Sequence, residues 1–333
     1  RPLRIVRVGA PRGDAPPRRR ARMKALWIAR PGGPEVLEVR EVPDPTPGPD
    51  EVLVRVRAAG LNRADLLQRR GLYPPPPGVP AEIPGLELAG EVETCGARVT
   101  SRSPGDSVMG IVAGAGQAER VALHERMALP IPDGMSFTDA AAIPEAFLTA
   151  YDALFARGGL RPGETALIHA AASGVGLAAA AIASASGAKV IALTRSEEKR
   201  RKLSDLGYDT TRPTSGVDVV IDFLGASSWA ENVEVLAPLG RLVLVGTMSG
   251  SKIEADLSPI MRKRLTVVGT VLRPRPIEEK IALAQEFART ILPLLAEGRM
   301  RPSVDRVLPL EDARAGHEAM ERNENFGKIV LTL

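Results

Sequence analysis

One stretch near the middle of the chain constrains the fold most. From Leu167 to Ala188 there is no Asp, Glu, Lys or Arg, and a segment of this length could span a membrane. Ala, Gly and Ser dominate it, however, and these residues contribute little transfer free energy beside Leu or Ile, so the composition argues against a span. The sequence instead predicts a strand over 165–170, a tight turn, and a helix from about Gly174 to Ser186.

A glycine motif lies where this strand should meet this helix. Gly174, Gly176 and Ala179 fit the pattern G-x-G-x-x-A. In such motifs the turn tolerates unusual backbone angles, the second Gly lets the backbone approach a pyrophosphate, and the third small residue lets the helix lie close to the sheet. The helix N-terminus adds amide donors and a favourable dipole. These features predict a dinucleotide cradle that includes Ser173 and Val175, although a closely packed Ala/Gly helix without a ligand remains open.

The residues about twenty positions after the first Gly indicate which dinucleotide is bound, because an acid there binds the ribose hydroxyls of NAD and repels an added phosphate. Here that position reads Thr194, Arg195, Ser196, with Lys199 one turn further on. Two cations and a hydroxyl can bind a 2′-phosphate, which predicts NADPH as the cofactor. The alternative is that the cations only solvate a helix face.

The surrounding sequence predicts an α/β protein. Short β-rich runs, such as "LEVREVP" and "DEVLVRVRAAGL", occupy the first part of the chain with frequent Pro and Gly between them. Strands and helices then alternate through "TALIHAA", "KVIALTR", "SEEKRRKLSDLG" and "VDVVIDFLG", which is typical of a parallel sheet covered by helices. The last strand, in "NFGKIVLTL", is expected to return to the first domain.

Charge is concentrated at the start of the chain. Residues 1–22 carry a net charge of +7 within a chain whose total is +4, so the remainder is acidic at −3. We interpret 1–22 as a disordered basic leader, with organelle targeting as a minority possibility. Nucleic-acid binding is disfavoured because the acidic remainder offers no continuous basic face. The single cysteine, Cys95, fits a reducing compartment, and we expect a cytoplasmic protein.

Several motifs together carry a family resemblance. They are "PGGPEVLEVREVPDPTPGPDEVLVRVRAAGLNRADLLQRRGLYPPPPG", "IPGLELAGEV", "AAIPEAFLTAYDAL", "LIHAAASGVG" and "NFGKIVL", which are spread along the chain from Met23 onwards. This part resembles the zinc-independent quinone oxidoreductase branch of the medium-chain dehydrogenase/reductase superfamily, and "NRADLLQRRGLYPPPPG" is similar to its p53-inducible group. The resemblance implies a GroES-like catalytic domain over 23–146 and 290–333, a Rossmann cofactor domain over 147–289, and a homodimer formed through the cofactor domain.

The zinc ligands of alcohol dehydrogenases in this superfamily are missing at the matching motifs. This chain has Asn62 before the first catalytic-domain helix and "GLE", Gly85-Leu86-Glu87, in place of Gly-His-Glu. Without thiolate or imidazole ligands no tetrahedral zinc site is expected. Of the three histidines, His169 is expected at a strand end and His124 and His317 are isolated, so each is expected to be structural or exposed.

The resemblance also implies roles for particular residues. Asn62 and Tyr73 would line the acceptor side, where an amide and a phenol can donate hydrogen bonds to a carbonyl that gains negative charge. Cofactor contacts are implied for Pro144, Glu145 and Thr149 in the junction helix, for Ser173, Gly174, Val175, Gly176, Arg195, Ser196 and Lys199 in the Rossmann half, and for Gly246, Thr247 and Asn325. For Tyr73, Glu145 and Thr149, ordinary packing or capping is an equal alternative.

Three features depart from the family pattern. Ala181 replaces a common Gln, residues 1–22 have no counterpart, and only nine residues separate Gly207 from Val217. A parallel crossover normally needs a dozen or more residues, so we expect one helix of the Rossmann half to be missing and the adjacent sheet edge to be uncovered.

The residues thus predict an NADPH-dependent, zinc-free reductase acting on a small-molecule quinone or α,β-unsaturated carbonyl by direct hydride transfer. One alternative is an enoyl-thioester reductase, which the Pro-rich mouth at 73–78 disfavours mildly. Another is a catalytically poor protein that acts by binding, as a structural or RNA-binding protein, which the short crossover favours.

Overall fold

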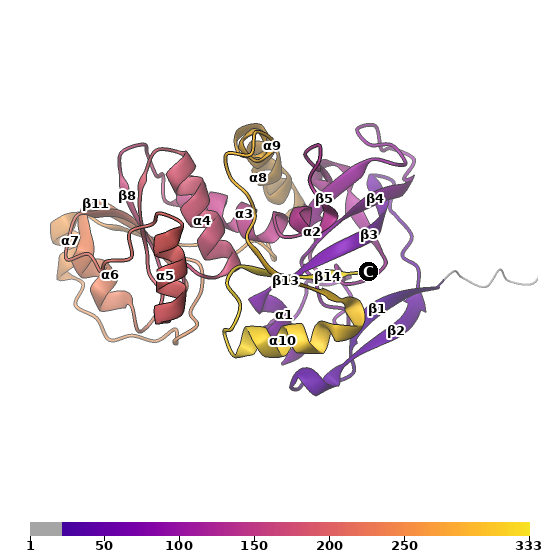
Figure 1. Ribbon diagram of the computed structural model, residues 1–333, viewed down its shortest axis with the longest axis horizontal. Helices are drawn as coiled ribbons and strands as arrows, with labels where there is room; N and C mark the ends of the chain where they lie inside the picture. The colour runs from indigo at the N-terminus through magenta and orange to yellow at the C-terminus, as the bar shows by residue number, and fades with distance from the viewer. Residues whose placement is uncertain (1–21) are drawn as a thin grey trace, which may run out of the picture.

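The predicted alternation of strands and helices forms a parallel sheet in the computed structural model, which describes residues 22–333 (Figure 1). Five strands pair in the order β12-β11-β10-β8-β9, and every pair is parallel. Their bounds are β8 Thr165–Ile168, β9 Lys189–Ala192, β10 Val217–Asp222, β11 Leu236–Leu244 and β12 Thr266–Gly269. The predicted Rossmann cofactor domain is therefore confirmed as a parallel α/β body.

Helices follow the strands along this part of the chain. They are α3 Pro144–Tyr151, α4 Gly174–Ala185, α5 Glu197–Asp205, α6 Trp229–Val235, α7 Ser258–Lys263, α8 Ile277–Thr290 and α9 Leu292–Ala296. Of these, α4, α6 and α7 contact strands of the sheet, whereas α8 contacts α3 and α9. The Ala-rich helix α4 packs against α3, and most of its residues are buried. Small side chains allow this close packing. Because the helix is buried, charged side chains are absent from the segment 167–188.

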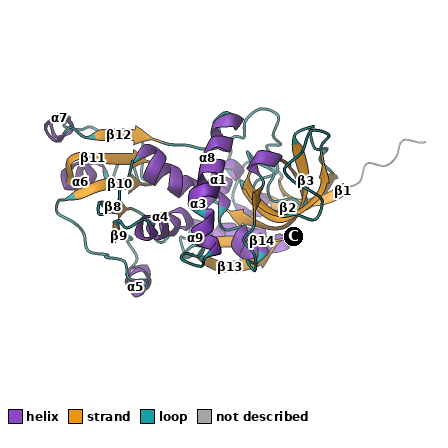
Figure 2. Ribbon diagram, turned by 90° about the horizontal axis from the view of Figure 1, so that it is seen from above, coloured by secondary structure: helices purple, strands orange, loops and turns teal. Residues whose placement is uncertain are grey.

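The shortened crossover is confirmed. Between the end of α5 and the start of β10 the structure has neither a helix nor a strand, and a single bridge from Asp209 to Ile191 is the only sheet pairing there. β9 is thus the edge strand, and Figure 2 shows α5 lying beyond it. Leu206, directly after α5, is 56% exposed.

A second, β-rich body forms the other half of the molecule (Figure 1). Its seven-stranded sheet has the order β13-β14-β3-β4-β5-β7, with β6 paired to β3, and β1 and β2 form a separate hairpin. The strands are β1 Arg22–Ile28, β2 Leu37–Pro43, β3 Glu51–Leu61, β4 Glu87–Cys95, β5 Ser107–Ile111, β6 Arg120–His124, β7 Leu129–Pro130, β13 Val304–Pro309 and β14 Lys328–Thr332. Its helices are α1 Arg63–Arg69, α2 Phe137–Ala140 and α10 Ala313–Glu321.

The last strand, β14, inserts between β13 and β3 and runs antiparallel to β3. This confirms that the tail returns to the first domain, and it brings Lys328 beside residues that lie more than 240 positions earlier in the chain. The predicted leader lies outside the described residues, apart from Arg22, which begins β1. Within residues 22–333, no helix is both long and apolar enough to cross a membrane.

Candidate active site

A cleft of about 720 Å³ lies between the carboxyl edge of the parallel sheet and the catalytic domain. Open α/β sheets bind ligands at this edge, and the volume suits a cofactor-sized ligand. The lining comes from the β8–α4 turn, the segment after β9, the start of α1 and the segment before β14. Of the predicted site residues, it brings together Asn62, Ser173, Gly174, Val175, Arg195, Ser196, Lys199 and Asn325.

The cradle at the start of α4 is built by a capping serine. Ser173 is the N-cap of α4, and its Oγ accepts a hydrogen bond from the Gly176 N–H at 3.1 Å. Gly174 and Val175 line the cleft beside it, so the first turn of α4 presents backbone N–H groups and the positive end of its dipole to a ligand. A pyrophosphate is the kind of group that this arrangement binds.

The two glycines differ from the sequence interpretation. Neither has a positive φ; the unusual angle falls on Ala170, at φ 44°. A Cβ on Gly176 would lie 2.5 Å from the Ala170 carbonyl oxygen, so this glycine allows the strand-to-helix turn to close rather than admitting a pyrophosphate. A Cβ on Gly174 would meet the Lys328 side chain at 2.5 Å. Gly174 is therefore the glycine that faces the cleft.

Cations gather at one end of the cleft. Arg195 is exposed there and makes no hydrogen bond or ion pair with any residue of the described range 22–333. Lys199 instead donates from Nζ to the backbone oxygens of Asn323 and Asn325, at 2.5 and 2.6 Å, and burial lowers its pKa. Lys199 thus ties α5 to the segment before β14, and of the two predicted cations Arg195 is the one left to meet a phosphate.

Three further arginines that the sequence did not single out lie at this end. They are Arg63, Arg212 and Arg322, which also line the cleft. Arg63 donates to Asn323 Oδ1 at 2.7 Å, and Arg212 pairs with Glu231. No local motif marks them, since they come from α1, the shortened crossover and the turn after α10.

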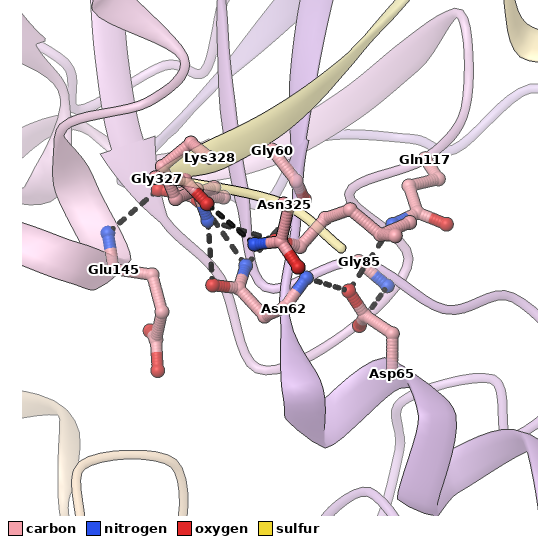
Figure 3. A network of polar contacts seen from close by, with 11 residues as sticks. Gly60, Asn62, Asp65, Gly85, Gln117, Glu145, Asn325, Gly327 and Lys328 are labelled. Atoms are coloured by element: carbon pink, nitrogen blue, oxygen red, sulfur yellow. Dashed lines mark hydrogen bonds and ion pairs between the residues drawn. The ribbon is translucent and has the colours of Figure 1, made fainter. Parts of the chain in front are cut away.

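A buried polar network closes the other end of the cleft (Figure 3). Lys328 Nζ donates to Asn62 Oδ1 at 2.7 Å, to the Leu61 carbonyl oxygen at 2.9 Å, and to Glu87 Oε1. Asn62 Nδ2 donates to the same Glu87 oxygen at 2.8 Å. Glu87 is fully buried and Lys328 is 4% exposed. Charges this deep are stable only when paired and hydrogen-bonded, as these are.

The network continues behind Asn62 to Asp65. Asp65 Oδ2 accepts from the Asn62 N–H at 2.8 Å and from Gln117 Nε2 at 3.2 Å, while Oδ1 accepts from the Gly85 N–H at 3.0 Å. Burial raises the pKa of Asp65 to about 6, against the two backbone hydrogen bonds that lower it. Asn62 is therefore held on both sides as the N-cap of α1, and its amide group is already engaged within the protein.

The remaining predicted residues lie outside this cleft lining. Tyr73 is half-buried, with its ring 5.0 Å below the Arg273 guanidinium. Arg273 also donates to the Tyr73 carbonyl oxygen at 3.0 Å and to Gln68 Oε1 at 2.6 Å. The others outside the lining are Pro144, Glu145 and Thr149 on α3, Gly176 in the turn, and Gly246 and Thr247 beside the cleft-lining Met248.

The histidines have structural surroundings. His169 is buried and its Nε2 lies 2.6 Å from Asn232 Oδ1, while His124 Nδ1 accepts from the Arg126 N–H. His317 Nδ1 lies 3.1 Å from Arg69 Nη1, and burial, helped by that guanidinium, lowers the pKa of His317 to about 3. Among residues 22–333, no three His, Cys, Asp or Glu side chains converge as metal ligands would.

Comparison with known proteins matches both halves of the chain. Residues 48–145 match the family described as "Alcohol dehydrogenase GroES-like domain", and residues 174–289 match "Zinc-binding dehydrogenase". A quinone oxidoreductase of Pseudomonas aeruginosa is 35% identical over 328 residues, covering 92% of this chain and 99% of that protein. The synaptic vesicle membrane protein VAT-1 homolog of Rattus norvegicus is 32% identical over 325 residues, covering 89% of this chain and 80% of that protein. The crystal structure of CurK enoyl reductase superposes with a TM-score of 0.81 at 26% identity, covering 93% of this chain and 99% of that one.

Proposed function

The chain belongs to the quinone oxidoreductase branch of the medium-chain dehydrogenase/reductase superfamily. From that premise we propose that it is an NADPH-dependent reductase that delivers hydride, without a metal ion, to a quinone or an α,β-unsaturated carbonyl. Membership makes it an oxidoreductase that uses a nicotinamide dinucleotide. The observation that carries the finer proposal is that one cleft joins the cradle at Ser173 and Gly174 to the buried Asn62–Lys328 network.

The residues present fit a dinucleotide. The first turn of α4 faces the cleft. A Cβ at position 174 would collide with the Lys328 side chain, so glycine keeps this space open. We place the pyrophosphate on this turn, with Asn325 and Ser173 beside it. Arg195, exposed and without a protein partner in the described range, supports NADPH over NADH because a 2′-phosphate would supply its counter-charge.

The bound dinucleotide would supply the hydride, and the protein's own residues would orient the acceptor and stabilise the charge that it gains. Because both polar atoms of Asn62 are engaged with Glu87 and Lys328, we assign Asn62 a positioning role rather than the predicted donation to the acceptor. Tyr73 remains the proposed donor, held by Arg273 through its ring and its carbonyl oxygen. Reduction of an electron-poor acceptor needs no metal when such groups align and polarise it.

We also propose a homodimer formed through the cofactor domain. β12 is the other edge of the parallel sheet, and its neighbourhood exposes Leu257 at 62%, Met261 at 74% and Val267 at 37%. An unpaired edge strand beside apolar side chains suits pairing with a second copy. Sedimentation that gives the mass of one chain at micromolar concentration would contradict the dimer. We further propose a cytoplasmic location, supported by the single cysteine, and the lack of a nucleic-acid partner, supported by the net charge of −3 beyond residue 22.

An enoyl-thioester reductase is the second candidate, favoured by the likeness to CurK enoyl reductase. Both candidates need hydride transfer to an unsaturated carbonyl, so the substrate distinguishes them. The test is calorimetric titration of the folded protein with NADPH and with NADH, followed by NADPH oxidation with a quinone, an enone and an enoyl thioester. We expect tighter NADPH binding and turnover of the quinone or enone. Binding of neither dinucleotide would move the non-catalytic alternative to the front.

A further inference from the structure

Glu145 contacts the buried network through its backbone. It lies in the first turn of α3, and its backbone N–H donates to Glu87 Oε2 at 2.7 Å. Its own carboxyl group makes no hydrogen bond or ion pair with any residue of the described range 22–333. Figure 3 shows that this group points away from Lys328 and the network residues. A carboxyl group placed in this way keeps both oxygens available to a ligand or to water.

The charged and titratable groups around Glu145 come from four directions. Glu87, Lys328 and Asp65 lie on the network side, Tyr73 on the Pro-rich loop, Arg273 on the segment after β12, and Lys280 on α8. As a whole residue, Glu145 is half-buried. Burial, with Glu87 as the next cause, raises the pKa of Glu145 to about 8. A carboxyl group in these surroundings holds its proton at neutral pH.

We propose that Glu145 is the proton donor that completes the reduction of an α,β-unsaturated carbonyl bound beside Tyr73. This inference rests on the proposed function and narrows its acceptor from quinones and enones in general to enones and enals. The placement supports it. The Glu145 N–H donates to Glu87, which also binds Asn62 and Lys328 of the cleft lining. Burial, and next the nearby Glu145, raise the pKa of Tyr73, so the free carboxyl group lies near the proposed hydrogen-bond donor.

The chemistry balances with one hydride and one proton. Hydride adds to the β-carbon, the C=C π electrons move towards the carbonyl oxygen, and the resulting enolate accepts the Glu145 proton at its α-carbon. The C=C double bond becomes a single bond, the dinucleotide is oxidised by two electrons, and the Glu145 carboxylate regains a proton from solvent. Tyr73 donates a hydrogen bond to the carbonyl oxygen throughout and keeps its own proton.

Comparing an enone with a quinone as acceptor distinguishes proton donation by Glu145 from a purely structural role. An enolate is a strong base that must be protonated on carbon, which is a slow step suited to a positioned acid. A quinone that receives hydride leaves as a hydroquinone anion, which water protonates rapidly on oxygen. Removing the acid should therefore slow enone reduction much more than quinone reduction.

The experiment compares wild type, Glu145→Gln and Glu145→Asp with an enone and a quinone under saturating NADPH. General acids contribute about 100-fold or more, so we expect the kcat for the enone to fall about 100-fold in Glu145→Gln and that for the quinone to fall less than about tenfold. Glu145→Asp should recover part of the enone rate. In wild type the enone kcat should fall above about pH 8, where Glu145 loses its proton. Glu145→Gln should lack this limb.

A matched control is Glu279→Gln, because Glu279 is an exposed carboxylate in the first turn of α8; it should change neither rate. Dinucleotide affinity and thermal midpoint, measured on each variant, show whether the variant is folded. Difference infrared titration of wild type against Glu145→Gln reads the carboxyl protonation without turnover. Equal losses for both acceptors, or a carboxyl group already ionised at pH 7, would overturn the proton-donor role. Failure of wild type itself to reduce any acceptor would overturn the proposed function and this role with it.

Discussion

The two ends of the cleft are built in opposite ways. At the phosphate end, Arg195 is exposed and lacks a partner within residues 22–333, and the neighbouring crossover is shortened. At the acceptor end, Asn62, Glu87 and Lys328 are buried and hydrogen-bonded to one another. Substitutions at the phosphate end should therefore cost little stability, whereas the residues of the acceptor end are part of the core. Ligand selectivity should therefore be separable from folding at the phosphate end only.

The largest expected effect comes from breaking the buried pair. Lys328→Met leaves the Glu87 carboxylate buried without its cation, and removing one partner of such a pair costs about 3–5 kcal/mol of unfolding free energy. The matched change at the other end, Arg195→Met, removes a cation from an exposed site and should cost less than about 0.5 kcal/mol. Urea unfolding followed by circular dichroism measures both.

The double variant Glu87→Gln with Lys328→Met sharpens this test. It removes both charges, so it should recover part of the stability lost in Lys328→Met. Similar losses for Lys328→Met and Arg195→Met would show that the two ends do not differ in the way described here.

The next largest effect concerns the cradle that connects the two ends. In Gly174→Val the new side chain would enter the space beside Lys328, where even a Cβ lies 2.5 Å from the Lys328 side chain. We expect the dissociation constants for NADPH and NADH to rise together by about 100-fold, equivalent to about 2.7 kcal/mol. Calorimetry on a folded variant measures this, and an unchanged dissociation constant would contradict the phosphate cradle.

The sequence predicted the strand, turn and helix at the phosphate end because their signals are local. Ser173 to Ala179 lie within two turns of chain, and the strand, turn and helix around them appear in the expected order. The short crossover could be read in the same way, from the nine residues between Gly207 and Val217. What sequence could not show is that Gly176 serves the turn and Gly174 the cleft, because that depends on which atoms a Cβ would meet.

The acceptor end resisted prediction for the opposite reason. Lys328 reaches Asn62 across 266 positions and Glu87 across 241, and no spacing in the sequence marks such pairs. The role expected for Asn62, donation to an acceptor, assumed a free amide, which the network does not leave. Glu145 was predicted as a cofactor contact or cap, and its free carboxyl group became evident only when the neighbouring elements were in place.

The cofactor preference should show a smaller, more selective effect. Arg195→Glu places a negative charge where the 2′-phosphate of NADPH is proposed to lie. Loss of a charged hydrogen bond and the added repulsion should weaken NADPH binding by about 2 kcal/mol, or roughly 30-fold. NADH binding should change less than about threefold, since it lacks that phosphate. Equal losses for both would show that Arg195 does not contact the 2′-phosphate.

The smallest expected effect is a loss of folding stability in acid, caused by His317 in the buried core behind the acceptor end. His317 is buried against Arg69, and its pKa is lowered to about 3 from an ordinary 6.5. The unfolded chain therefore binds a proton below pH 6.5 that the folded chain refuses, so stability is complete above pH 6.5 and declines as the pH falls towards 3. Between pH 7.5 and 5.5 this single group should lower the unfolding free energy by about 1.4 kcal/mol.

A comparison of variants is needed to see this loss, because burial raises the pKa of Asp65 and of Glu145 and both groups stabilise the fold as the pH falls. Their contributions cancel in the difference between wild type and His317→Gln, whose amide oxygen can still accept from Arg69. That difference should shift by about 1.4 kcal/mol between pH 7.5 and 5.5 in favour of the variant. Hydrogen exchange should place the wild-type loss in α1 and α10, which carry Arg69 and His317, and leave the parallel sheet unchanged. A loss spread equally over both halves would mean that the buried core behind the acceptor end and the cofactor domain respond to acid as one unit.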